Sequence, residues 1–128
     1  DGLSEAERAA IQLNVNLDSV AGSPNLTALT SGFAAAEAWL VEAAGRHGRS
    51  LGAYRPLMQN SDHYNFARHG VPAARFVAGF DEPNSNLRHV LTEGDNRDKI
   101  AAGDLAAAAA LVAGIIADAC QADDLNLR

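Results

Sequence analysis

The feature that most constrains the fold is an alternation of strand-like and helix-like segments along the chain. Between residues 12 and 17, apolar and polar residues alternate one by one, which is typical of a half-buried strand. Between residues 101 and 121, apolar residues recur at spacings that suit a helix packed on a sheet. Strands that alternate with helices predict an α/β fold with a parallel or mixed sheet.

The predicted elements follow from this pattern and from the turn residues between them. Ser31 is predicted to cap the first long helix, and Ser61 to cap a short helix whose first turn holds Asp62 and His63. Gly70 and Pro72 suit the turn that follows. Strands are predicted over residues 12–17, 26–30, 51–56 and 73–78, helices over 33–46, 61–70 and 101–121, and a polar loop over 79–99. The predicted core comprises Leu13, Val15, Leu17, Leu26, Leu29, Trp39, Leu40, Phe66, Phe76, Val77, Leu111 and Ile115.

Length and charge narrow the class of protein. The 128 residues suffice for one domain, and no second domain is expected. The net charge is −6 and no cluster of Lys or Arg is present, so neither nucleic acid nor a membrane surface is an expected partner.

The single cysteine, Cys120, excludes an internal disulfide and a thiolate-rich zinc site. It is expected to be a small buried residue of the last helix.

Three polar features lie where strands are predicted to end, which is where α/β sheets bind ligands. Asp18 follows the first strand, the pair Asp62 and His63 opens the short helix, and His89 lies in the loop after the strand at 73–78. A carboxylate and an imidazole from two strand ends could bind a shared zinc ion. The residues alone leave this open.

Each of these residues also has an ordinary structural explanation. Asp18 could bond backbone N–H groups of its turn, and Asp62 could lie at the positive end of the helix dipole. His63 could bond at that helix end, and His89 could be solvated. His47 and His69, each followed by a glycine, suit C-terminal capping.

The order of three segments is more specific than any single residue. The chain carries "LNVNLDSVAG", then "NSDHYNFARHGVPAARF", then "LRHVLTEGDNRDKI" before the final helix. This order resembles the C-terminal half of the M28 family of zinc aminopeptidases. The resemblance implies a three-layer αβα fold around a mixed sheet, incomplete in this chain. Residues 1–128 are therefore expected to be the C-terminal portion of one M28-like catalytic domain.

The resemblance also implies a site with two zinc ions and a peptide substrate. Asp18 matches an acid that binds one zinc, and His89 matches the late histidine that binds the other. Asp62 and His63 are implied to line the pocket or support its wall. The implied reaction is hydrolysis of N-terminal peptide bonds by a zinc-activated water, with a glutamate as general base.

Two departures from the family pattern bear on activity. No H-x-D or E-E segment precedes Asp18, so the chain holds at most two of five metal ligands and is expected to be inactive alone. His89 stands two residues further from the T-x-x-D tail than the family's histidine. Either His89 still reaches the metal or one zinc is lost. Arg88 takes the place of a tyrosine and could contact the oxyanion or substrate, or be solvated.

Two alternatives to an aminopeptidase remain at this point. One is a non-catalytic protein-binding module of the same fold, and the other is a single-zinc transferase similar to glutaminyl cyclase. Exposed strand edges of an incomplete sheet predict a homodimer. No signal peptide or membrane segment is predicted, and the compartment stays open.

Overall fold

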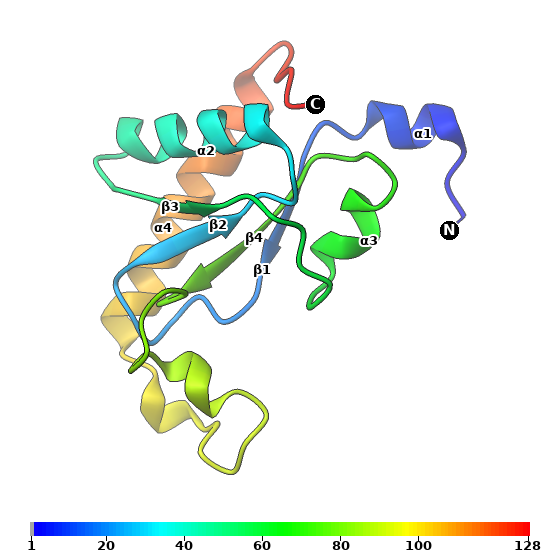
Figure 1. Ribbon diagram of the computed structural model, residues 1–128. Coiled ribbons are helices and arrows are strands. Elements are labelled where there is room, and N and C mark those ends of the chain that lie inside the picture. Colours follow the sequence, from blue (N-terminus) through cyan, green and yellow to red (C-terminus); the bar gives the residue numbers. More distant parts are fainter. Residues whose placement is uncertain (1) are drawn as a thin grey trace.

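The computed structural model describes residues 2–128 as a four-stranded sheet with helices on both faces (Figure 1). The strand order is β1-β4-β2-β3. The elements in chain order are α1 (Glu5–Ala10), β1 (Asn14–Leu17), β2 (Leu26–Leu29), α2 (Ala34–Arg46), β3 (Gly52–Tyr54), α3 (His63–Ala67), β4 (Ala73–Ala78), the 3-10 helices η1 (Asn86–His89) and η2 (Arg97–Lys99), and α4 (Ala102–Gln121).

The sheet is mixed, as the sequence predicted. β4 lies between β1, to which it is parallel, and β2, to which it is antiparallel. β2 and β3 are parallel. Because β1 and β4 run in the same direction, the residues that follow these two strands lie at the same end of the sheet. This end is next to the loop that carries η1 and η2 (Figure 1).

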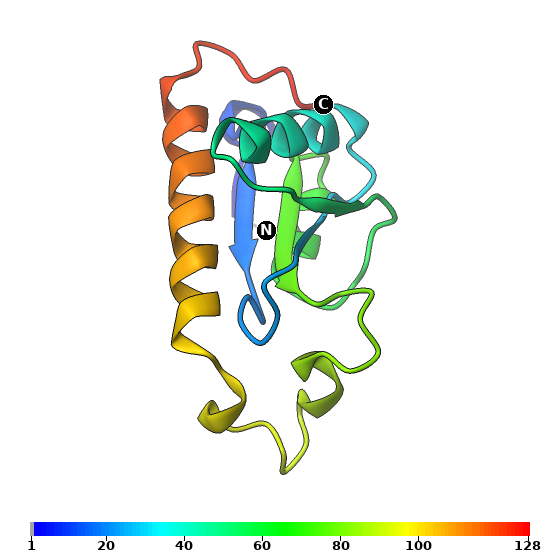
Figure 2. The ribbon, with the colours of Figure 1, turned by 90° about the vertical axis from the view of Figure 1, so that its left-hand side faces the viewer.

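The main core lies between the sheet and two helices. Phe76 and its β4 neighbours Ala74 and Ala78 face α2 and α4, which contribute Leu40 and Ile115. Figure 2 shows α4 running along one side of the sheet. Most predicted core residues are buried or partly buried. Leu17 is the exception, with 49% of its surface exposed, because it lies on the edge strand β1.

Helix starts account for most of the errors in the predicted elements. α1 was not predicted, although Ser4 and Glu7 form a capping box, which the spacing S-x-x-E signals. Ser31 does not cap α2. It is buried with φ 59°, and Phe33 is the N-cap. The predicted polar loop contains the two 3-10 helices.

The last helix differs from expectation in two ways. Cys120 is exposed rather than buried, because it lies on the face of α4 away from Ile115 and the core. The helix has 20 residues with a mean hydropathy of 1.7, so it meets the length and composition of a membrane span. Its residues Ala108, Leu111, Val112 and Ile115 pack in the core of the domain.

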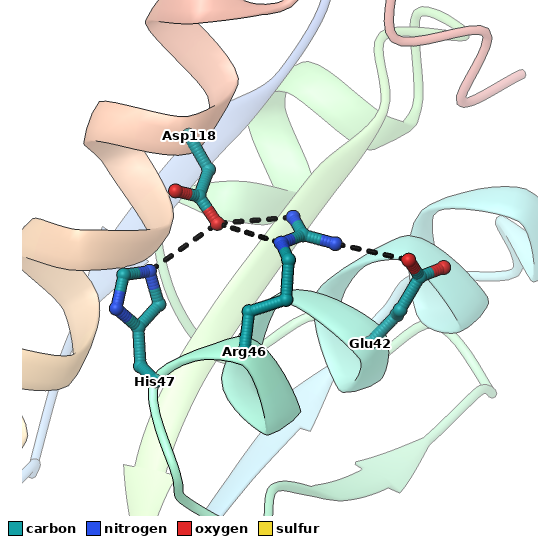
Figure 3. A network of polar contacts seen from close by, with 4 residues as sticks. All are labelled: Glu42, Arg46, His47 and Asp118. Carbon is teal, nitrogen blue, oxygen red and sulfur yellow. Dashed lines mark hydrogen bonds and ion pairs between the residues drawn. The ribbon is translucent and has the colours of Figure 1, made fainter.

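A polar network joins the C-terminal end of α2 to α4 (Figure 3). Asp118 Oδ2 accepts hydrogen bonds from Arg46 Nε at 3.1 Å and contacts His47 Nε2 at 3.2 Å. Arg46 also pairs with Glu42 at 3.1 Å. His47 is the C-cap of α2, as predicted, and its ring packs where a Cβ on Gly114 would stand. The glycine therefore lets the imidazole approach the helix.

Replacing Asp118 with asparagine should lower the free energy of unfolding by roughly 0.5–1 kcal/mol, because partly exposed ion pairs contribute little. The loss should shrink in high salt. Urea unfolding at two salt concentrations measures it. The matched control is Glu42→Gln, whose pair with Arg46 is more exposed and should matter less. Equal losses in both variants would contradict a central role for Asp118.

Candidate functional site

Backbone hydrogen bonds of Asp18 and Ser19 fix Asp18 at the end of the sheet where β1 and β4 finish. Its N–H donates to the carbonyl of Phe76 at 3.3 Å, and Ala78 N–H donates to the carbonyl of Ser19 at 2.9 Å. Ser19 has φ 62°, a left-handed conformation that is uncommon for a non-glycine residue and turns the chain away from the strand. Asp18 therefore stands just beyond the carboxyl ends of β1 and β4.

The carboxylate of Asp18 is contacted by three side chains, those of Ser61, Arg75 and Ser19. Ser61 Oγ donates to Asp18 Oδ2 at 2.7 Å and itself accepts from Asn16 Nδ2 at 2.7 Å. Arg75 NH2 lies 3.3 Å from the same Oδ2. The other oxygen, Oδ1, has one long contact, with Ser19 Oγ at 3.2 Å. Ser61 was predicted to cap α3, but its hydroxyl ties the start of that helix to β1.

Arg75 is the functional candidate that sequence reasoning missed. It lies on the face of β4 opposite Phe76, and only 8% of its surface is exposed. Its Nε has no hydrogen-bond partner among residues 2–128. The signal in the sequence was a lone cation within the otherwise apolar strand "AARFVA". A charged residue is rare in a fully buried strand unless it is paired.

His63 lies beside this pair and is completely buried. Neither ring nitrogen has a hydrogen-bond partner among the described residues, so the bond expected at the helix end is absent. Burial is the main cause that lowers the pKa of His63; the positive charge of Arg75 adds to it, while Asp18 and Asp62 oppose it. Asp62 is exposed and is the N-cap of α3 without a side-chain bond.

A cavity of about 480 Å³ opens at Asp18 and Arg75. Asn60 is the third polar residue of its lining. The remaining walls are apolar and come from the sheet and from the loop after β4: Leu29, Val77, Phe80, Leu87, Val90 and Leu91. The arrangement offers one anionic and one cationic group at the sheet, facing apolar walls.

Neither His89 nor Arg88 is part of the lining of this cavity. His89 lines an adjoining cavity of about 390 Å³ that shares Leu87 and Val90 with the first. Arg88 Nε donates to His89 Nε2 at 3.1 Å, and Arg88 NH1 donates to Asn84 Oδ1 at 3.2 Å. The His89 ring also packs against Gly94. Asp18 and His89 thus lie at the same sheet edge but belong to different cavities.

The residues fit a zinc site only in part. Asp18 offers the right kind of donor, and its held Oδ2 leaves Oδ1 nearly free. His89 lines the adjoining cavity, and its Nε2 accepts a hydrogen bond from Arg88. Within residues 2–128 no three His, Cys, Asp or Glu side chains stand close enough to hold a metal ion. A zinc site would need further donors and a rotation of the His89 ring.

Comparison with known proteins gives consistent matches. The sequence pattern of Peptidase family M28 matches residues 2–116. A zinc aminopeptidase from Bacillus subtilis is 26% identical, with a TM-score of 0.79 over 99% of this chain and 33% of that one. An aminopeptidase from Aneurinibacillus sp. strain AM-1 is 25% identical, with a TM-score of 0.69 over 98% of this chain and 30% of that one.

The chain therefore spans about a third of the length of these structural relatives. A search of the curated proteins found no match. The sequence expectation of a partial zinc-aminopeptidase fold is confirmed by these matches.

Proposed function

Because the chain belongs to peptidase family M28, we propose that it is the C-terminal portion of the catalytic domain of a zinc-dependent aminopeptidase. The observation that carries the proposal is the position of Asp18 beyond the joined ends of β1 and β4, beside a cavity. The relatives from Bacillus subtilis and Aneurinibacillus are both aminopeptidases, and part of each has the fold of this chain. The substrate would be the amino-terminal end of a peptide.

In this proposal each side chain of the site has a separate task. Asp18 and His89 would contribute ligands to the metal, and zinc bound there would supply an activated water for hydrolysis of the peptide bond. Ser61 and Arg75 orient the Asp18 carboxylate through Oδ2. His63 is buried near Arg75, and both its burial and the charge of Arg75 lower its pKa, which favours the neutral imidazole. The contacts from Ser61 and Arg75 fix the orientation of the Asp18 carboxylate, as hydrogen-bond partners of metal-binding side chains commonly do.

Arg88 and Asp62 are assigned to the site by their positions in the chain. Arg88 would contact the substrate or its developing oxyanion after leaving His89. Asp62, exposed at the start of α3, would contribute to the outer wall. The Arg88–His89 bond also favours a second candidate, a non-catalytic binding module, because it occupies a nitrogen that would bind the metal.

The 128-residue chain alone should show no peptidase turnover, because it lacks enough donors for the metal and a general base among its described site residues. The measurement is release of anilide from an aminoacyl anilide with added zinc. A longer protein that includes the remaining part of the domain should turn the substrate over, and a chelator or Asp18→Asn should stop it. Chelator-sensitive turnover by the short chain, or full activity of Asp18→Asn, would contradict the proposal.

A further inference from the structure

Arg75 carries a charge that the described residues leave poorly compensated. Among residues 2–128 its only ion pair is the 3.3 Å contact with Asp18, whose side chain is 40% exposed and also bound by Ser61. The Nε–H group is buried without an acceptor among residues 2–128. A guanidinium presents five N–H donors, and a buried donor without a partner is costly. Some acceptor is therefore expected at this position.

Stability does not explain an arginine here. Methionine at position 75 would fill a similar volume in an apolar strand without the cost of burying a cation. The neighbouring side chain His63 carries no negative charge, and neither of its ring nitrogens is hydrogen-bonded to Arg75 or to any other residue of the described part of the chain. The missing acceptor must therefore come from outside this group of residues.

The cavity beside Arg75 has the chemistry of a site for a carboxylate. Arg75, Asp18 and Asn60 are its polar lining, and the other walls are apolar. An arginine fork matches the two oxygens of a carboxylate and binds them with geometric specificity. Asp18, which lies next to it, would repel a bare anion but favours a ligand that also carries a cationic group, such as the ammonium of a peptide.

We propose that Arg75 binds a carboxylate of the substrate, so that the cavity selects peptides with an acidic group close to the free amino terminus. This inference rests on the aminopeptidase function proposed above and names its substrate class. The carboxylate has two sources, the side chain of an acidic residue or the C-terminus of a dipeptide. Both place a carboxylate and an ammonium within one short ligand.

The test is binding, measured by NMR in the presence of a chelator. The Nε–H resonance of Arg75 is followed while three peptides are added: leucyl-leucinamide without a carboxylate, glutamyl-leucinamide with a side-chain carboxylate, and leucyl-leucine with a C-terminal one. We expect at least one acidic peptide to bind about 10-fold or more tightly than the neutral amide, with a shift of the Nε–H signal. The peptide that binds identifies the source.

Two variants and one control separate charge from fork geometry. Arg75→Met should abolish the preference, and Arg75→Lys should retain only part of it, because an ammonium cannot bind both oxygens in a fork. Arg49→Met, which removes an exposed arginine far from the cavity lining, should leave the preference unchanged.

Equal affinity for all three peptides, no saturable binding by any, or an unchanged preference in Arg75→Met would overturn the inference. Failure of the peptidase proposal gives a different result. In that case the longer protein hydrolyses neither a leucine anilide nor a glutamate anilide, while the carboxylate binding to Arg75 is still observed. The wild-type Nε–H signal decides the question even if a variant does not fold.

Discussion

The variant Arg75→Met should be more stable than the wild-type protein by roughly 1–3 kcal/mol in the free energy of unfolding, which is the cost of a buried N–H group without a partner. The cause is the buried guanidinium, whose Nε has no partner among the described residues. Asp18 is left without its cation, but its side chain is 40% exposed and keeps the bond from Ser61. Water can therefore solvate the remaining carboxylate. The absence of Arg75 should lower the free energy of unfolding only slightly through Asp18.

Urea unfolding of both proteins at neutral pH measures this gain. The control Arg49→Met removes an exposed arginine and should change stability by less than about 0.5 kcal/mol. A clear loss of stability in Arg75→Met would show instead that the ion pair with Asp18 holds β1 against β4. A gain in stability would agree with an arginine that is retained for binding, because functional sites often reduce the stability of a protein.

Acid should destabilise the protein through His63 as the pH falls from the ordinary histidine value of about 6.5 toward the ordinary glutamate value of about 4.3. The pKa of the buried imidazole is lowered, mainly by burial and then by the charge of Arg75. As the pH falls below the ordinary histidine value of about 6.5, the unfolded chain takes up a proton that the folded protein refuses. The contribution of neutral His63 to stability is therefore fully present above that pH. It is lost as the pH falls toward the pKa of His63 in the folded protein. The slope is at most about 1.4 kcal/mol per pH unit for one proton.

The variant His63→Phe keeps a planar ring at this position and should lose the slope in that window. Thermal unfolding of both proteins at half-unit pH steps gives the comparison. Glu7 and Glu37 also have lowered pKa values, but their effect begins below the ordinary glutamate value and lies outside the window. His69, whose pKa is also lowered, is exposed and stays in both proteins. An unchanged slope in His63→Phe would assign the pH dependence to another group.

The sheet was largely predictable because its strands are bounded by strong local signals. The run from Ala73 to Ala78 follows a glycine and a proline, and all six residues are buried, so the apolar pattern and the strand coincide. The helix at Ala34–Arg46 was placed within a residue for the same reason, since glycine follows it at position 48. The order of the three motifs identified the family because motif order does not depend on tertiary contacts.

The site was less predictable because its contacts join residues far apart in the sequence. Ser61 looked like a helix cap, and only the fold shows that its hydroxyl reaches Asp18, 43 positions earlier. His63 looked like a residue at an exposed helix end, but α3 packs on β4 and buries it. Arg75 carried a local signal, because it is a cation inside an apolar strand. The pattern of apolar residues could not show which side chain pairs with it.

The most direct test of the account is anomalous diffraction at the zinc edge, on crystals of the longer protein grown with zinc. The account predicts two peaks about 3.5–4 Å apart, one bound to the Asp18 carboxylate and the other to an imidazole of His89 that has turned away from Arg88. Zinc bound elsewhere, with Asp18 contacting only Ser61, Ser19 and Arg75 and His89 still bonded to Arg88, would contradict it.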